Sequence, residues 1–140
     1  MRIRSILPPI CFAAFLAVCT FGQAVEDKGR STIGFIRDSG TIESKSGSTI
    51  GYIRRDGTIE NSSRSTLGYL QNNGTVENKS RSTIGYIRSN GTVENSSRST
   101  IGYVRSNGTV ENASRSTIGY ARGIKPEHAA IFFFFFFGVK

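Results

Sequence analysis

The sequence predicts an all-β protein with one helix, in which a closed barrel or flower of about six β-hairpins surrounds a hydrophobic C-terminal helix. Three observations lead to this prediction: a 17-residue repeat, a glycine-containing turn signal in most units, and an uninterrupted apolar segment near the C-terminus. The repeat and the turn signal predict the hairpins, and the apolar segment predicts the helix that fills the barrel.

The repeat keeps its period without insertion or deletion. Each unit holds a Ser-Thr-Ile/Leu-Gly-Tyr/Phe phrase, and its glycine recurs at Gly34, Gly51, Gly68, Gly85, Gly102 and Gly119. A second glycine series has the same spacing, at Gly40, Gly57, Gly74, Gly91 and Gly108. Constant spacing of both series indicates one supersecondary unit per repeat, with each unit packed on its neighbours.

Each unit is expected to reverse at its second glycine. The pair Asn90-Gly91 follows a β-branched and aromatic run and precedes Thr92-Val93. Such a pair accepts positive φ at both central positions of a type I′ turn, whose twist suits a hairpin. The signal recurs at Asn107-Gly108, Asn73-Gly74 and Asp56-Gly57, with Ser39-Gly40 as a weaker version.

A two-residue turn also fixes which side chains share a face. Pairing outward from the turn places Arg88 opposite Val93 and Tyr86 opposite Asn95. Ile84, Tyr86 and Val93 then share the predicted buried face. The isoleucine that follows the tyrosine falls on the opposite face, against this assignment.

The two ends of the repeat array are complementary halves of one unit. Residues 25–30 align with residues 76–81, which form the second half of a unit, and residues 116–122 form a first half. Five whole hairpins plus one assembled from both ends give six hairpins and twelve strands, with no exposed sheet edge.

A barrel of twelve strands is too wide for its own side chains to fill. Pro126 and Glu127 suit a helix start, and residues 129–137 are apolar throughout. This run is about half as long as a membrane-spanning helix, and a helix apolar on all sides belongs inside the barrel. Two alternatives are a β segment over residues 132–137 and shallow insertion into a membrane interface.

Residues 1–24 have the pattern of a secretory signal peptide. Arg2 and Arg4 precede an apolar run, and Gly22-Gln23-Ala24 resembles a cleavage site. The predicted organisation is therefore a signal peptide over 1–24, a hairpin barrel over 25–125 and the barrel-filling helix over 126–140. A secreted, periplasmic or envelope-associated location follows.

Both cysteines, Cys11 and Cys19, fall within the predicted leader, so the mature chain is expected to contain no disulfide. A lipoprotein signal with lipidation at Cys19 is the alternative, although Val18 stands where such signals have a small residue.

The full chain has a formal net charge of +8, and removal of Arg2 and Arg4 leaves +6. Outside the cytoplasm this charge favours anionic lipid headgroups or acidic polysaccharide as partners, and not nucleic acid. Charge that serves only solubility is the alternative. The chain is expected to be a monomer, with fibre assembly as the second possibility.

No catalytic or metal-binding constellation is visible. The single histidine, His128, has no cysteine or second histidine in phase with it. Catalysis needs unlike groups that converge, whereas a repeat distributes the same groups around a ring. We therefore expect a non-enzymatic protein with no catalytic residues, no metal and no cofactor.

The candidate ligand-binding residues are arginines that precede the turns: Arg37, Arg54, Arg88, Arg105 and Arg122. A second series lies between units, at Arg30, Arg64, Arg81, Arg98 and Arg115. The two series are expected at opposite rims, where guanidinium groups bind phosphate or carboxylate. Gln71 interrupts the first series, and Gly47 interrupts the second. In the alternative interpretation, these arginines neutralise the repeated glutamates. The repeated tyrosines are expected in the core, with ligand stacking as the alternative.

The phrases Gly-Tyr-Ile-Arg and Asn-Gly-Thr-Val-Glu-Asn, followed by the apolar segment, resemble the β-flower proteins, small bacterial repeat proteins with radially arranged hairpins. Over residues 25–140 the pattern is also similar, more distantly, to the Tubby C-terminal domain, a twelve-stranded barrel around a hydrophobic C-terminal helix. The first resemblance implies a fold and no settled activity. Tubby domains bind phosphoinositides, which suggests lipid binding here. This suggestion is an analogy only, because no corresponding motif transfers to this chain.

These observations favour a non-enzymatic secreted or envelope-associated repeat module that binds anionic lipid or glycan through basic rims. The rival interpretation is a structural or adhesive surface protein that assembles through its β-repeats.

Overall fold

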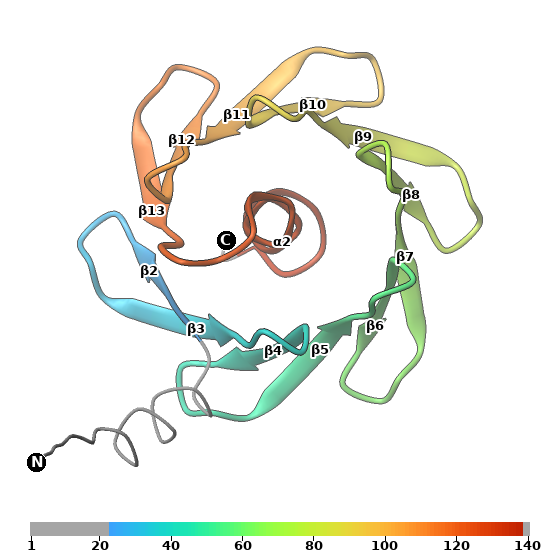
Figure 1. Cartoon of the computed structure of the whole chain (residues 1–140), viewed down its shortest axis with the longest axis horizontal. Helices are drawn as coiled ribbons and strands as arrows, with labels where there is room; N and C mark the ends of the chain where they lie inside the picture. Colours follow the sequence, from blue (N-terminus) through green and yellow to red (C-terminus); the bar gives the residue numbers. More distant parts are fainter. Residues whose placement is uncertain (1–22, 139–140) are drawn as a thin grey trace, which may run out of the picture.

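The computed structural model of the protein describes residues 23–138. Twelve antiparallel strands form one closed barrel in which β13 pairs with β2, so the ends of the repeat array complete the ring (Figure 1). The strands are β2 Gln23–Asp27, β3 Thr32–Ile36, β4 Thr41–Ser44, β5 Thr49–Ile53, β6 Thr58–Asn61, β7 Thr66–Leu70, β8 Thr75–Asn78, β9 Thr83–Ile87, β10 Thr92–Asn95, β11 Thr100–Val104, β12 Thr109–Asn112 and β13 Thr117–Tyr120.

The C-terminal segment lies on the barrel axis. It consists of α2 (Pro126–Ala130) and the π-helical η2 (Ile131–Phe135), both enclosed by the strands in Figure 1. The predicted six-hairpin barrel around a C-terminal helix is therefore confirmed. The predicted signal peptide over 1–24 and both cysteines fall outside the described residues, except that Gln23 and Ala24 belong to β2, which begins before the predicted boundary.

The hairpin turns differ from the predicted type I′ turn. The amide of Gly91 donates to the carbonyl of Arg88 at 3.0 Å, and the amide of Arg88 donates to the carbonyl of Thr92 at 2.8 Å. Within this turn only Gly91 has positive φ, at 91°. This is a three-residue loop, a tight turn followed by one left-handed glycine bulge, so the two-residue prediction was wrong.

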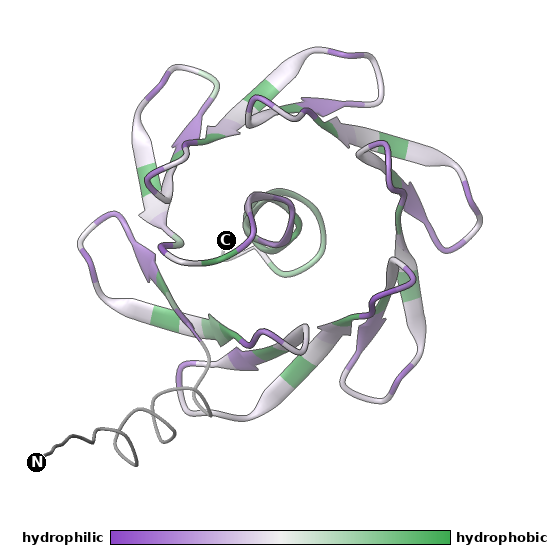
Figure 2. Ribbon diagram, viewed as in Figure 1, coloured by the Kyte–Doolittle hydropathy of each residue, from purple (hydrophilic) through white to green (hydrophobic). Residues whose placement is uncertain are grey.

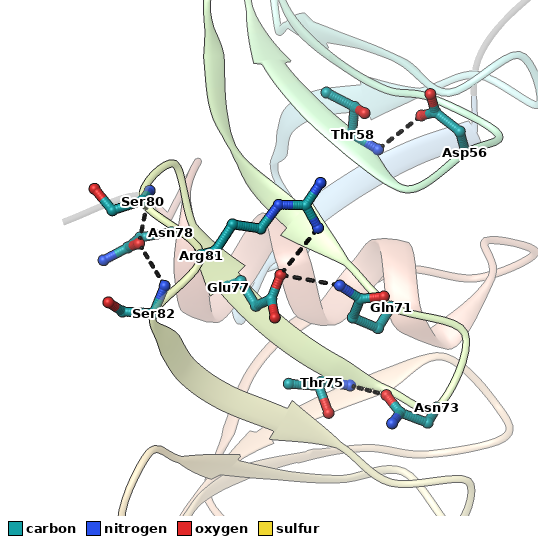
Figure 3. Close-up of polar contacts among 10 residues, drawn as sticks. All are labelled: Asp56, Thr58, Gln71, Asn73, Thr75, Glu77, Asn78, Ser80, Arg81 and Ser82. Atoms are coloured by element: carbon teal, nitrogen blue, oxygen red, sulfur yellow. Dashed lines mark hydrogen bonds and ion pairs between the residues drawn. The ribbon is translucent and has the colours of Figure 1, made fainter.

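The residue before the turn glycine explains this choice. The Oδ1 atom of Asn90 accepts a hydrogen bond from the amide of Thr92 at 3.0 Å, and Asp56 does the same for Thr58 at 2.9 Å (Figure 3). This side-chain bond satisfies the chain locally without positive φ at the Asx residue. The bond from Thr58 also lowers the pKa of Asp56 below its ordinary value.

The longer loop moves the strand register by one residue. Val93 pairs with Ile87, Glu94 with Tyr86, and Asn95 with Gly85. Because side chains alternate, this slip exchanges the two faces of the hairpin. Ile87 and Val93 are buried, whereas Tyr86 is only half-buried and lies on the outer face with Glu94. The predicted buried face, and with it the expectation that the tyrosines lie in the core, was therefore wrong.

Apolar side chains form regular rings inside the barrel. Figure 2 shows that hydrophobic residues recur from hairpin to hairpin. Six fully buried residues, one from each even-numbered strand, form the first ring: Val25, Ile42, Ile59, Val76, Val93 and Val110. A second ring lies beside it at Ile36, Ile53, Leu70, Ile87, Val104 and Ala121. Ala129 and Ala130 of α2 are fully buried in the same core, so the part of the helix with small side chains lies where the wall has the larger valine and isoleucine side chains.

The phenylalanines pack where the barrel wall has glycine. Each of six consecutive phenylalanines approaches the glycine of a different repeat. The pairs are Phe132 with Gly34, Phe133 with Gly119, Phe134 with Gly102, Phe135 with Gly85, Phe136 with Gly68, and Phe137 with Gly51. At five of these glycines a Cβ atom would clash with the ring, and at all six it would lie within 2.6 Å of a carbonyl oxygen on the neighbouring strand, which explains why this glycine is repeated in every unit.

Successive phenylalanines contact successive hairpins, so six residues complete one circuit of the barrel. An α-helix completes a turn in 3.6 residues and would skip hairpins. The chain widens instead: the amide of Phe136 donates to the carbonyl of Ile131 at 3.1 Å, an i to i+5 bond. Neither helical segment within residues 23–138 is long enough to cross a bilayer.

Candidate functional site

The outer face of the barrel carries a repeated group of tyrosine, glutamate and arginine. In the hairpin β7–β8, Arg81 lies 3.4 Å from Glu77 and its guanidinium stacks 3.6 Å from the ring centre of Tyr69. Gln71 donates a hydrogen bond to the same carboxylate at 2.9 Å (Figure 3). Two side chains from opposite ends of the hairpin therefore meet at one glutamate.

The predicted ligand-binding arginines lie on this outer face. Four of them each contact the glutamate six residues later, in the pairs Arg37–Glu43 at 2.7 Å, Arg54–Glu60 at 3.0 Å, Arg88–Glu94 at 2.9 Å and Arg105–Glu111 at 2.8 Å. The fifth, Arg122, lies 5.4 Å from the ring centre of Tyr120. In four hairpins the first arginine series therefore acts as the counter-ion of a glutamate.

The two series do not gather at opposite rims. Arg54 and Arg64 start from different ends of their hairpin, yet their guanidinium groups lie 3.0 Å and 3.9 Å from the carboxylate of Glu60. The slipped register places both arginines beside the outward-facing glutamate, which accounts for the difference from the sequence expectation.

The second series has an unusual backbone. All five of its arginines have positive φ, between 66° and 71°, a conformation that costs a non-glycine residue about 1–2 kcal/mol. Each guanidinium stacks on a tyrosine twelve residues earlier in the repeat register, at 3.6 to 4.2 Å from the ring centre. The pairs are Arg30–Tyr120, Arg64–Tyr52, Arg81–Tyr69, Arg98–Tyr86 and Arg115–Tyr103. We call these five pairs the arginine belt.

In the first repeat, both members of the belt pair are replaced together. Gly47 occupies the position of the stacked arginine and has φ of 88°, while Phe35 replaces the tyrosine in the same unit. The two departures occur together, twelve residues apart. This joint exception is a sequence signal for the pairing of arginine with tyrosine, and it is missed when the arginine and tyrosine series are interpreted separately.

The belt gives the outer face a positive surface. The repeated positions hold ten arginines and six glutamates. Side chains of Arg64, Arg81 and Arg115 are 54–59% exposed, whereas Glu60, Glu77 and Glu111 are 9–16% exposed. A ligand that approaches the barrel wall therefore meets guanidinium groups before carboxylates.

At one mouth of the barrel, His128 is partly buried at the beginning of α2. Burial lowers the pKa of its imidazole below the ordinary value, against a smaller opposing effect of Glu127. Within residues 23–138 no cluster of three or more histidine, cysteine, aspartate or glutamate side chains could hold a metal ion.

Residues 22–137 match the model of a family described as the 5-fold β-flower protein. The chain belongs to the β-flower family. Its barrel contains six hairpins, five of them closed by a turn glycine and the sixth completed by β13 and β2. No curated protein and no solved structure matches this β-flower. Family and fold together describe a structural repeat module.

Proposed function

We propose that this β-flower is a non-enzymatic binding module that holds acidic polysaccharide along its arginine belt. The observation that carries the proposal is the stacking of five guanidinium groups on tyrosines at 3.6 to 4.2 Å. A stacked guanidinium keeps the donors at its edge available for carboxylate or sulfate, and its orientation is already restricted before binding.

The position of the belt favours a polymer. Two strands separate equivalent positions on neighbouring hairpins, so the arginines recur about every 10 Å around the wall. A flexible chain can follow this curved surface and contact several guanidinium groups at once, which multiplies weak contacts. A flat lipid surface would touch only one sector of the wall.

The first arginine series has a supporting role in this proposal. Arg54, Arg88 and Arg105 bind the glutamates at 2.8 to 3.0 Å, which reduces the negative charge beside the belt. These residues therefore shape the potential of the site, and the belt arginines make the ligand contacts.

Assembly into fibres through strand addition is the rival function. A closed barrel pairs each of the twelve described strands on both sides, so no strand edge is open to a second chain. This topology favours the binding module over the fibre.

Retention on immobilised dextran sulfate and polygalacturonate, with uncharged dextran as the control, tests the proposal. We expect saturable retention that weakens with salt, because each arginine contact releases counter-ions. A paired assay with vesicles of anionic and neutral lipid tests the lipid alternative.

The variants Arg64→Gly and Arg98→Gly remove belt arginines at positions where the first unit already has glycine. Each variant should weaken polymer retention while its unfolding curve changes little. Equal retention by the wild type and by a double variant that carries both substitutions would rule out the belt. Stronger retention on anionic vesicles than on polysaccharide would assign the surface to lipid.

A further inference from the structure

We propose a second site at the mouth of the barrel, a basin that binds a small hydroxylated anion such as a sugar acid or sugar phosphate. The basin lies between the hairpin turns and the start of α2 and has a volume of about 940 Å³. Its size falls within the range of small-molecule sites. Its wall includes Asp38, Arg55, Asn72, Lys125 and His128.

The basin lies where the repeat loses its uniformity. The residue two positions before the turn glycine is serine in the fourth and fifth turns, at Ser89, which also lines the basin, and at Ser106, which does not. In the first three turns it is Asp38, Arg55 and Asn72, and all three line the basin. Unlike groups thus converge at one side of an otherwise repetitive ring, which is the arrangement that a specific ligand requires.

Two cations in the basin wall are available to an anion. Arg55 and Lys125 form no ion pair with any residue of the described part of the chain, 23–138. By contrast, Arg54 and Arg88, which also line the basin, are bound to Glu60 and Glu94. Arg55 and Lys125 are therefore the groups that select a carboxylate or phosphate.

The remaining groups suit hydroxyls. The carboxylates of Asp38 and Glu127 accept hydrogen bonds, and the side-chain amide of Asn72 donates and accepts them. The lowered pKa of His128 leaves a neutral imidazole that also does both. The basin lining contains no phenylalanine, tyrosine or tryptophan, and its large apolar residues are Ile53, Leu70, Ile87 and Pro126, which can pack on the carbon skeleton of a polyol. A polyol with one anionic group can pair with the two cations and also hydrogen-bond to these polar groups.

The proposal is tested by calorimetric titration of the full protein with glucose 6-phosphate, glucuronate, inorganic phosphate and glucose. We expect saturable binding of at least one of the first two probes, with at least about tenfold weaker binding of glucose, since glucose cannot pair with Arg55 or Lys125. The two charged sugars distinguish a phosphate from a carboxylate site. If neither charged sugar binds at millimolar concentration, or if inorganic phosphate binds as well as both, the proposal is wrong.

The chain offers a matched control. Arg55→Ser copies the serine of the fourth turn and should fold normally while it weakens binding about tenfold. The double variant Arg55→Ser with Ser106→Arg restores the net charge on a turn outside the basin, and it should bind as weakly as Arg55→Ser. Full recovery of affinity by the double variant would assign binding to net charge and overturn the site. Lys79→Ser removes the same charge at an exposed position outside the basin, where the neighbouring units have Ser62 and Ser96, and it should leave this affinity unchanged.

Discussion

A Cβ atom at Gly102 would clash with the edge of the Phe134 ring, at its Cζ atom, and would lie 2.6 Å from the carbonyl oxygen of Glu111. Glycine is therefore required at this position by two neighbours, one on the adjacent strand and one on the central segment. The same double contact recurs around the barrel and joins the wall to the axis.

Gly102→Ala is expected to destabilise the protein by about 1–3 kcal/mol, the usual cost of overpacking a core. Gly29→Ala is the matched control, because a Cβ there meets its nearest atom at 3.4 Å and its backbone has ordinary φ. Chemical denaturation of both variants measures the difference. Similar losses in the two variants would show that the aromatic contact does not determine the choice of glycine.

The number of phenylalanines is expected to match the number of hairpins. Deletion of one phenylalanine shifts the run by one residue and leaves Gly51 without its ring, at a cost of about 2–4 kcal/mol. Insertion of a seventh phenylalanine before Gly138 should add no stability, because no further glycine is available. Thermal unfolding of both variants checks this prediction, and a stabilising insertion would contradict it.

The stacked arginine is expected to offset its own backbone strain. Arg98→Gly loses a stacking contact of about 0.5–1 kcal/mol and also the positive-φ penalty of about 1–2 kcal/mol, while ordering a glycine costs about 0.5–1 kcal/mol, so stability should change little. Arg98→Ala keeps the penalty and loses the contact, and it should be less stable by about 1 kcal/mol. Denaturation midpoints decide between these outcomes, and equal stability of both variants would refute the compensation.

His128 should make stability depend on pH. Burial lowers its pKa in the folded state below the ordinary value of 6.5, so the unfolded chain binds the proton more readily. The contribution of the neutral imidazole is fully present above pH 6.5 and is lost as pH falls toward the folded-state pKa. Unfolding free energy should therefore decrease in this interval. His128→Gln should remove that part of the slope, and an unchanged slope would exclude His128 as its source.

Much of the architecture was accessible from the sequence because repetition multiplies each local signal. The 17-residue period predicted the hairpins, the half-units at residues 25–30 and 116–122 predicted closure, and the all-round apolarity of residues 129–137 predicted the axial helix. As expected, β13 pairs with β2, and α2 lies inside the ring of strands (Figure 1).

The strand faces were not accessible in the same way. The choice between a two-residue and a three-residue loop depends on whether Asn90 takes positive φ, and its side-chain bond to Thr92 decides that question. A single residue of loop length moved every tyrosine from the expected core to the outer face. The stacked pairs followed from that change, so the candidate site could not be predicted before the register was known.

Gly47 and Phe35 interrupt the arginine belt at one place on the ring. Within residues 23–138 the sector of Gly47 and Phe35 lacks the belt pair, so a ligand that follows the ring meets the five belt pairs and then an interruption. The belt therefore has a first and a last arginine although the barrel is nearly symmetric, and the five arginines limit how many ligand repeats one molecule can bind.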